Sequence, residues 1–547
     1  MRNTTTQSWR TAPVKTIQPT DWLSLATILA LAIVLRLLFY TGFFGSDEVT
    51  YVETAVGITS GDWHASNYIG ATRYGMNLPV ALFIYLFGLS EASANLWPFL
   101  CSIGEVAIVF VVARRLWGLR VAVISATLLA LLPLHVHYAG RMMADPPLAF
   151  FLSLSVLLLL HAVHAKHSLS YIAAGLAWGA VFWVKESVAL LYLPVFLSLS
   201  LVLNRFDGRG LWILFGMAIA LLGNCVLMNF VSGNPLHVFA VMSKALATVN
   251  SMATLDTSPW YYFRYFFMDI RHTFLLGFLV AAGIALYVRY FVRDNQAAPQ
   301  AQFVILWIFL LVGMFSFALV SFSPVQLVMK QTNYMLIFAA PLALLAGWFL
   351  ASLPRQVFVP LSILILSGSV ILAALEQQAV TVFTANSKAA YIFLRDHPKT
   401  YLVATINNVR AINFFSMMEN RQKIRERVMS FSDMAEIESV NAIDSLATKT
   451  REKDIYALLD LESIFWGSKT NGIRNRSDVP TCWQSMGPLT PAALGNGSWV
   501  TQSLLIAGAV LPESLQQPYM AILQPLTAPK TAHLFKVSKS CLTRLLR

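Results

Sequence analysis

Two adjacent carboxylates, Asp47 and Glu48, follow directly after the first long apolar segment of the chain. They stand in the sequence Ser46-Asp-Glu-Val-Thr-Tyr-Val-Glu53. A carboxylate at a membrane surface is able to act as a general base on a hydroxyl group brought to that surface. Asp and Glu are also favoured in the first turn of a helix, so a purely structural capping role is a second interpretation. Both are open from the residues alone.

A further acidic position is Asp145, in the sequence Arg141-Met-Met-Ala-Asp-Pro-Pro147. An Asp followed by Pro is a common helix start, so capping alone would account for this carboxylate. Capping does not account for Arg141, although an Arg near an interface often extends its charged end to water.

Three cations, Arg73, Lys185 and Lys330, stand in or beside apolar segments. Charged residues in such places are candidates for function. Glu186 follows Lys185 and offers local neutralisation as an alternative, whereas Lys330 has no acid close to it in the sequence. An anionic ligand is the natural partner of such a cation, and lipid phosphate is the commonest anion at that depth.

Polar residues inside the apolar segments have a simpler interpretation. Arg36 lies within the first segment and is able to pair with a neighbouring helix. His135 and His137 do not share a helix face, so they do not predict a metal site and are assigned to packing or polar contacts.

The composition defines the class of protein that must position these residues. Of 547 residues, 57% are apolar and 12% are charged, against about 25% charged in a soluble domain. Residues 1–379 hold 20 basic and 14 acidic residues, and residues 380–547 hold 19 and 13, so each part has a net charge of +6. This even distribution does not indicate a nucleic-acid surface. It fits basic loops on anionic lipid.

A membrane helix needs about 20 mostly apolar residues, and the chain offers eleven such segments. They are residues 22–43, 92–113, 121–138, 147–165, 170–184, 187–203, 211–231, 272–291, 302–322, 334–350 and 357–376. The expected domains are a cytoplasmic segment 1–21, a transmembrane domain 22–379 with external loops 44–78 and 232–271, and an extracytoplasmic domain 380–547. The polar residues before the first span predict no cleavable signal peptide.

The distribution of basic residues predicts the orientation, because cytoplasmic loops are enriched in Lys and Arg. With the N-terminus inside, the inside segments carry Arg2, Arg10, Lys15, Arg114, Arg115, Arg120, Lys166, Arg205, Arg209, Arg289, Arg293 and Arg355. The tail and Asp47, Asp145, Lys185 and Lys330 are then expected on the opposite, outer face.

The external segments and the tail have their own patterns. In loop 44–78, apolar residues at helical spacing end at Gly61, which predicts an interfacial helix. Residues 401–406 and 455–459 are predicted strands, and residues 386–396 and 410–427 are predicted helices, so the tail is expected to be a small α/β domain. Cys482 and Cys541 are candidates for a disulfide if the tail lies outside the cell membrane.

The order of these features resembles the GT-C class of membrane glycosyltransferases, in the group of the protein O-mannosyltransferases and the lipid A aminoarabinose transferase. The matching segments are Arg36, the Ser-Asp-Glu-x-x-Tyr motif at 46–51, Gly61-Asp62, Arg141–Asp145, Gly175–Lys185 and Lys330–Tyr334 followed by Pro341. The sequence departs from the family at two places. Asn333 stands where the family usually has Arg, and Arg73 would have to substitute for the Lys of a Lys-Pro-Pro motif.

The resemblance implies a GT-C fold, a polyprenyl-phosphate sugar donor and inversion at the anomeric carbon. It makes Asp47 the general base, with Glu48 orienting it or sharing the site, and Asp145 supporting the base or placing the acceptor. Arg73, Lys185, Lys330 and Arg141 would hold the donor phosphate, where preorganised cations stabilise the leaving group.

Several features implied by the resemblance are less specific. Tyr51 and Tyr334 belong to the same motifs and are candidates for acceptor or interfacial contacts. No cofactor is expected for a donor with one phosphate, although a divalent metal is possible because related oligosaccharyltransferases with pyrophosphate donors use one. The expected partners are the donor, a protein, lipid A or glycan acceptor, and the bilayer, in a bacterial inner membrane.

Two other functions compete with this hypothesis. A transporter or flippase for polyprenyl or sugar lipids would show repeated halves and broken helices, and neither is evident in the sequence. A catalytically silent lipid-binding scaffold is disfavoured by the intact pair of carboxylates, Asp47 and Glu48.

Overall fold

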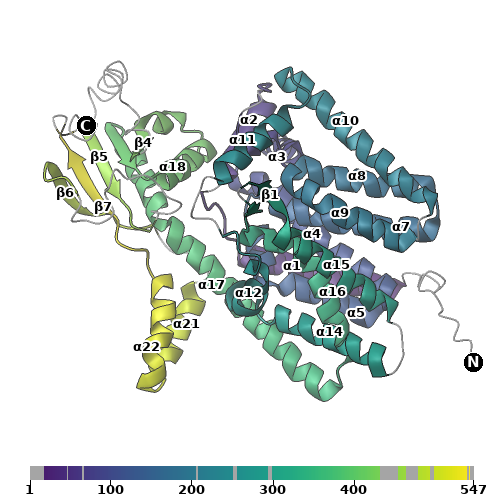
Figure 1. Cartoon of the computed structure of the whole chain (residues 1–547). Helices are drawn as coiled ribbons and strands as arrows, with labels where there is room; N and C mark the ends of the chain where they lie inside the picture. Colours follow the sequence, from purple (N-terminus) through teal and green to yellow (C-terminus); the bar gives the residue numbers. More distant parts are fainter. Residues whose placement is uncertain are drawn as a thin grey trace, which may run out of the picture. The chain divides into compact units, whose positions relative to one another are not determined.

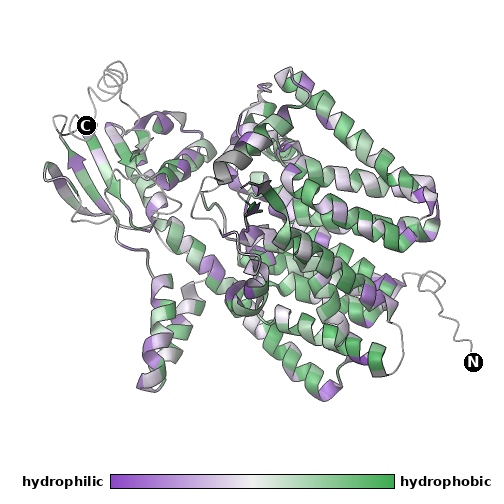
Figure 2. Ribbon diagram, viewed as in Figure 1, coloured by the Kyte–Doolittle hydropathy of each residue, from purple (hydrophilic) through white to green (hydrophobic). Residues whose placement is uncertain are grey.

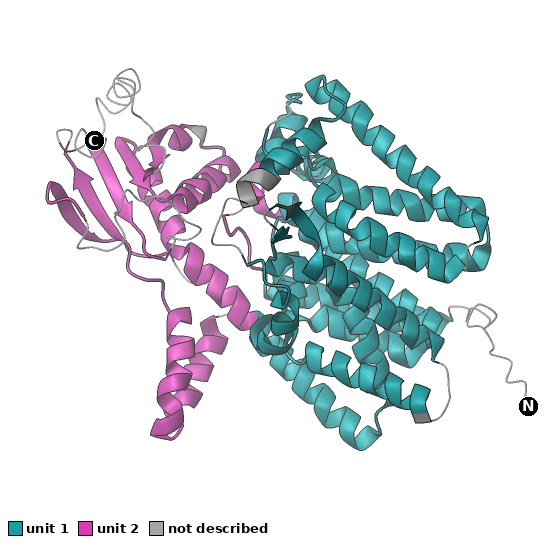
Figure 3. Ribbon diagram, in the orientation of Figure 1, with its two compact units in different colours: residues 1–40, 51–88, 93–373 teal, residues 41–50, 89–92, 374–547 magenta. Residues whose placement is uncertain are grey.

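The computed structural model describes residues 18–45, 47–63, 67–204, 207–250, 256–293, 298–323, 325–431, 454–462, 479–492, 498–538 and 541. Residues 1–17 of the expected cytoplasmic segment, and with them Arg2, Arg10 and Lys15, lie outside this range, as do Ser46 and Arg205. The chain divides into two compact units (Figure 3). Unit 1 contains residues 1–40, 51–88 and 93–373, and unit 2 contains residues 41–50, 89–92 and 374–547.

Unit 1 is helical (Figure 1). Its first helices are α1 (Pro19–Leu38), α2 (Glu48–Thr59, beginning in unit 2), α3 (Tyr74–Phe87), α4 (Glu91–Leu116, also beginning in unit 2), α5 (Leu119–Leu131), α6 (Pro133–Ala139), α7 (Asp145–Ala165), α8 (Ser168–Val184) and α9 (Glu186–Asn204). They are followed by α10 (Trp212–Ser232), α11 (His237–Asn250), α12 (Tyr261–Met268), α13 (Ile270–Thr273), α14 (Leu276–Arg293), α15 (Pro299–Phe317) and α16 (Leu336–Ser352). Helix α17 (Arg355–Asp396) continues into unit 2.

Among the described residues, eight helices are long and apolar enough to cross a bilayer, or nine if α5 and α6, bent by 60° at Leu132, form one span. In Figure 2, the ribbon coloured by hydropathy shows that these helices consist mostly of hydrophobic residues. The two remaining predicted spans coincide with α8 and the apolar part of α14, which are shorter. The expected class, a helical polytopic membrane protein with a small C-terminal sheet domain, is confirmed.

The structure corrects two predicted ends of spans and one predicted end of a loop. Helix α1 ends at Leu38 rather than at residue 43, and Gly42 has a φ of 70° that no α-helix continues through. The predicted loop 44–78 ends inside helix α3. The span predicted as 302–322 stops at Phe317, because strands β1 (Leu319–Phe322) and β2 (Val325–Leu327) form an antiparallel hairpin there.

Small residues set the closest helix packing in unit 1. A Cβ atom added to Gly175 of α8 would collide with the Ile213 carbonyl of α10, and one added to Gly216 of α10 would collide with the Ile172 carbonyl. Such glycines let two membrane helices approach backbone to backbone. The glycine-rich span that precedes Lys185 therefore serves to fix α8 against α10.

Unit 2 contains a five-stranded sheet in the order β4–β3–β5–β7–β6. The strands are β3 (Thr400–Ala404), β4 (Val428–Ser430), β5 (Asp454–Leu459), β6 (Trp483–Pro488) and β7 (His533–Val537). Strand β3 is parallel to β4 and β5, and β7 is antiparallel to β5 and β6. The end of α17 and helix α18 (Ile406–Met418) pack on one face through Leu394 and Ile412.

The α/β character of the tail is as predicted, but its helices differ. The predicted helix 386–396 is the end of the 42-residue helix α17. The predicted helix 410–427 is α18 followed by a 3-10 turn, η4 (Gln422–Arg427). Asn420 has a φ of 54°, a left-handed conformation that ends an α-helix.

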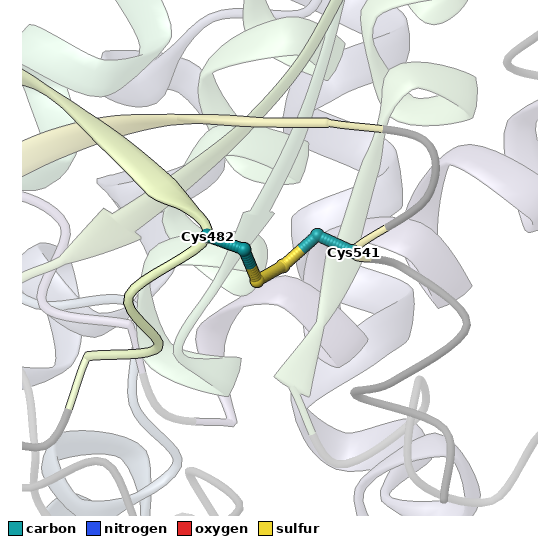
Figure 4. Close-up of a disulfide and its surroundings, with 2 residues drawn as sticks. All are labelled: Cys482 and Cys541. Atoms are coloured by element: carbon teal, nitrogen blue, oxygen red, sulfur yellow. A yellow bond between two sulfur atoms is a disulfide. The ribbon is translucent and has the colours of Figure 1, made fainter.

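A disulfide joins Cys482, just before β6, to Cys541, after β7 (Figure 4). The sequence left the pairing of these two cysteines open, and the structure joins them. Cys541 is buried in the core on one face of the sheet, together with Trp483 and Phe535. The other two cysteines, Cys101 and Cys225, are free.

Candidate active site

Asp145 and Lys185 form a buried ion pair in unit 1. Asp145 is the first residue of α7, and Lys185 lies at the break between α8 and α9. Lys185 Nζ donates to Asp145 Oδ1 at 2.9 Å, and Asn333 Nδ2 donates to the same oxygen at 3.0 Å. Asp145 is 1% exposed, and its second oxygen, Oδ2, has no hydrogen-bond partner among the described residues. The carboxylate therefore neutralises Lys185 and keeps an unused acceptor.

A second ion pair lies beside the first along the chain. Glu186, which follows Lys185, places Oε2 3.5 Å from Arg73 Nε. Arg73 Nη1 also donates to the Tyr51 hydroxyl of α2 at 2.7 Å. Glu186 Oε1 has no hydrogen-bond partner among the described residues. Each of the two pairs contains one cation and one carboxylate, so their four charges cancel.

Close helix packing positions Arg73 next to Glu186. Arg73 precedes α3, whose residue Gly75 meets the end of α8. A Cβ on Gly75 would stand 2.8 Å from the backbone nitrogen of Val184, so any larger residue would push the two helices apart. Tyr334, in the 3-10 turn η3 (Thr332–Met335), completes the cluster, with its ring centre 4.5 Å from Lys185 Nζ. This distance is typical of a cation–π interaction.

Lys330 is buried in the loop between β2 and η3. Its Nζ donates to the Thr257 carbonyl at 3.1 Å. Burial lowers the pKa of the Lys330 ammonium to about 8, while the charge of Asp256 opposes this shift. Lys330 has no acidic neighbour in the sequence, but the fold brings Asp256, from the segment before α12, close to it.

Arg141 lies in the turn between α6 and α7. Its guanidinium carbon is 5.4 Å from the ring centre of Tyr138, and the side chain is buried. Seven predicted site residues therefore lie in unit 1: Tyr51, Arg73, Arg141, Asp145, Lys185, Lys330 and Tyr334. Arg73 and Lys185 are linked along the chain, because Glu186, the ion-pair partner of Arg73, directly follows Lys185.

Asp47 and Glu48 lie in the short segment 41–50 that belongs to unit 2. Glu48 is fully buried, and its Oε2 accepts hydrogen bonds from the backbone N–H groups of Phe44 and Gly45 at 2.8 and 2.9 Å. Phe43 stacks on Phe414 of α18. Glu48 therefore stabilises the turn that comes just before Asp47. Asp47 is half-buried and directly precedes α2.

One buried polar network was not predicted as a unit. Arg36 Nη2 donates to His135 Nδ1 at 2.6 Å, and His135 Nε2 is 2.9 Å from Glu105 Oε2. Because a guanidinium only donates, His135 Nδ1 accepts, and the proton of a neutral ring lies on Nε2, facing Glu105. The assignments of Arg36 to helix pairing and of His135 to polar contacts are confirmed. Glu105, a lone acid within the second apolar span, was the signal that would have revealed the network.

The part of the chain that the structure describes contains no group of three or more His, Cys, Asp or Glu side chains arranged to hold a metal ion. Nitrogen and oxygen donors are nevertheless present as pairs, such as His272 Nδ1 and Asp269 Oδ1 at 3.0 Å.

The fold and the buried site define an integral membrane protein with paired charges between its helices. Residues 76–229 match the family model described as dolichyl-phosphate-mannose-protein mannosyltransferase. This segment runs from α3 to α10 and holds Arg141, Asp145, Lys185 and Glu186. The resemblance predicted from the sequence, to GT-C glycosyltransferases of this group, is confirmed.

Among curated proteins, the undecaprenyl phosphate-α-4-amino-4-deoxy-L-arabinose arabinosyl transferase of Pseudomonas aeruginosa (strain LESB58) is 27% identical over 172 residues. These residues make up 30% of this chain and 31% of that protein, so the match spans about a third of the relative's length.

Two solved structures are similar at lower identity. ArnT from Cupriavidus metallidurans, bound to undecaprenyl phosphate, has a TM-score of 0.46 and 18% identity, over 80% of this chain and 86% of that chain. The oligosaccharyltransferase of Archaeoglobus fulgidus in its apo form has a TM-score of 0.49 and 13% identity, over 95% and 89%.

Proposed function

We propose that this protein is a membrane glycosyltransferase that moves a sugar from a polyprenyl-phosphate donor to an acceptor hydroxyl. The observation that carries the proposal is the buried pair of Asp145 and Lys185, which lies inside the segment matched to the mannosyltransferase family model. The partial match to a transferase named for an undecaprenyl phosphate-linked sugar supports the donor class.

The charges of unit 1 fit such a donor. Its candidate cations are Arg73, Arg141, Lys185 and Lys330, of which Lys185 and Arg73 form ion pairs with Asp145 and Glu186. A sugar phosphodiester has one negative charge, and the phosphate monoester that it leaves behind has nearly two, since its second pKa is about 6. Preorganised cations therefore stabilise the departing phosphate more than the donor, as electrostatic catalysis requires.

In the proposed reaction, Asp47 takes the proton of the acceptor hydroxyl. The acceptor oxygen forms a bond to the anomeric carbon from the face opposite the phosphate, the carbon–oxygen bond to the phosphate breaks, and the phosphate keeps the electron pair. The configuration is inverted. Glu48 acts through the backbone of residues 44 and 45, which it binds, and so positions Asp47. Asp145 restrains Lys185 until a phosphate competes for the ammonium.

The substitution Asp47→Asn tests the base. Transfer is expected to fall by about 10²- to 10⁴-fold, the usual contribution of a general base, while binding of polyprenyl phosphate stays unchanged because the shape is kept. The matched control is Glu53→Gln on α2, one turn after the start of the helix, for which normal turnover is expected. Normal turnover by the Asp47→Asn protein would reject the role of Asp47.

We propose a bacterial inner membrane as the location, with the active site and unit 2 on the extracytoplasmic face. The Cys482–Cys541 disulfide supports this orientation, because disulfides persist in oxidising compartments. A membrane-impermeant maleimide, added after reduction to intact spheroplasts, is expected to label Cys482, which is more exposed than the buried Cys541. Labelling only in inside-out vesicles would reverse the orientation.

Catalysis is proposed to need no divalent metal, and the expectation is that transfer continues in EDTA. Loss of transfer that Mn²⁺ or Mg²⁺ restores would contradict this. The acceptor is proposed to be a hydroxyl of a protein, lipid A or a glycan.

The competing function is a polyprenyl-lipid or sugar-lipid flippase, and the break between α5 and α6 favours keeping it as a candidate. In liposomes that contain the purified protein, movement of a fluorescent polyprenyl phosphate sugar between leaflets, without any transfer to added acceptors, would favour the flippase.

A further inference from the structure

A helical hairpin near the end of unit 2 has an unusual surface. It consists of α21 (Ser498–Ala509) and α22 (Glu513–Leu523), followed by the 3-10 turn η6 (Gln524–Leu526). The two helices are locked together, since the Tyr519 hydroxyl of α22 donates to the Leu504 carbonyl of α21 at 2.9 Å. A Cβ on Gly508 would collide with the Tyr519 ring.

The exposed apolar side chains of unit 2 are concentrated on this hairpin. Seven large hydrophobic side chains are exposed in the described part of the unit, and five of them lie between residues 498 and 526. These five are Trp499, Ile506, Val510, Leu515 and Ile522, with exposures from 57% to 82%. An apolar patch of this kind marks a surface that binds a protein or a membrane.

The charge content of the hairpin favours lipid as the occupant. Residues 380–547 hold 32 charged residues, but residues 498–526 hold one, Glu513. A protein interface keeps a polar and charged rim, whereas a segment that enters a bilayer excludes charges almost completely.

The attachment of the hairpin places it at the end of a membrane span. Gln378 of α17 donates from Nε2 to the Leu526 carbonyl at 2.9 Å, at the base of the hairpin. Six of the seven exposed large apolar side chains of α17 lie between Val357 and Ile371, and the seventh is Ile392. Ile371 is about 10 Å before Gln378 at 1.5 Å per residue. In Figure 3 the hairpin and the unit 2 part of α17 leave the sheet on the same side.

The length of the hairpin suits an interfacial segment. Its helices of 12 and 11 residues extend about 16 to 18 Å, and interfacial segments are buried by about 5 to 10 Å. Only the tip of the hairpin therefore enters the interface, and Glu513, next to the tip, stays within reach of the headgroups.

We propose that the α21–α22 hairpin is a membrane anchor that inserts its tip, around Val510, into the outer interface of the bilayer in which the chain resides. The anchor fixes unit 2 at a second point besides α17. It rests on the chain being a membrane protein and is independent of the proposed glycosyl transfer.

The test uses the full chain with Cys101 and Cys225 replaced by Ser and the native disulfide kept. A single cysteine at Val510→Cys or Ile522→Cys is labelled with the fluorophore NBD and reconstituted in nanodiscs. The matched control is Ser485→Cys, exposed on β6. Doxyl groups near the headgroup end of the lipid acyl chains are expected to quench the label at residue 510, but not at residue 485 or at residue 522, which lies at the base of the hairpin.

Equal, water-like emission at residues 510 and 485, quenched only by aqueous iodide, would overturn the proposal. The label at residue 510 could also be protected from both iodide and lipid quenchers, but only at high protein-to-nanodisc ratios. That result would overturn the proposal as well and would assign the hairpin to contact with a second copy. No donor or acceptor is added, so either result is separate from a failure of the proposed enzyme activity.

Discussion

Two buried polar networks in unit 1 differ in how completely their atoms are hydrogen-bonded. In the network of Arg36, Ser102, Glu105, His135 and Ser153, all three guanidinium nitrogens, both ring nitrogens and both carboxylate oxygens have partners. In the cluster around Asp145 and Lys185, Asp145 Oδ2 and Glu186 Oε1 have none among the described residues.

From this difference in hydrogen bonding we infer a structural role for the first network and a functional role for the second. A satisfied buried network resists change, because every altered atom leaves a partner unpaired. Unsatisfied buried acceptors are costly in proteins, and binding a ligand or a moving proton is one use for them. The first network joins α1, α4, α6 and α7, and we interpret it as a structural link within the bundle. We propose the second as the place for substrate.

The largest effect is expected for Glu105→Gln. The amide keeps the shape but loses the charge opposite Arg36, and breaking a buried pair costs about 3 to 5 kcal/mol. Thermal unfolding in nanodiscs should show this loss. The protein that stays folded should keep normal transfer per molecule.

Ser102→Ala is the matched control for the same network. It removes one partner of the Arg36 Nε atom and should cost about 1 to 3 kcal/mol. If Glu105→Gln abolished transfer without lowering stability, the network would belong to the catalytic machinery and the contrast between the two networks would fail.

Asp145→Asn tests the second network, with a smaller effect on stability. Asn also starts helices well, so α7 should persist. Without the charge of Asp145, Lys185 is released toward a phosphate, and polyprenyl phosphate should bind on the order of tenfold more tightly, which corresponds to about 1.4 kcal/mol. Transfer should decline, because product release slows. Unchanged phosphate affinity and normal transfer would show that Asp145 only begins the helix.

These residues also show what the sequence is able to predict. The charges of Asp145, Lys185 and Arg73 were visible because charge is rare in apolar segments. Their partners were not. Glu186 was an alternative partner for Lys185, yet it pairs with Arg73, since adjacent residues at a helix start point in different directions.

The length of the apolar segments predicted most spans but few of their ends. A continuous apolar run of about 20 residues defines α7 or α16, whereas the end of α15 depends on the short hairpin of β1 and β2, whose residues are themselves largely apolar. Asn333 illustrates the same limit. The departure from the family was recognisable, but its hydrogen bond to Asp145, 188 positions away, is a property of the fold.

The smallest predicted effect concerns Lys330, which differs from Lys185 in having a carbonyl rather than a carboxylate as its Nζ partner. Its pKa is lowered to about 8, below that of the unfolded chain, so the folded state binds fewer protons between those two values. Stability from this group therefore increases as the pH rises through 8 toward the unfolded pKa.

Phosphate binding should change in the opposite sense, because only the protonated amine attracts the anion. The affinity for polyprenyl phosphate is expected to fall as the pH rises through about 8. Titration calorimetry at several pH values measures this. Lys330→Arg keeps its charge throughout, so its affinity should be flat over the same range. An equal decline in both proteins would assign the pH dependence to another group and remove Lys330 from the phosphate site.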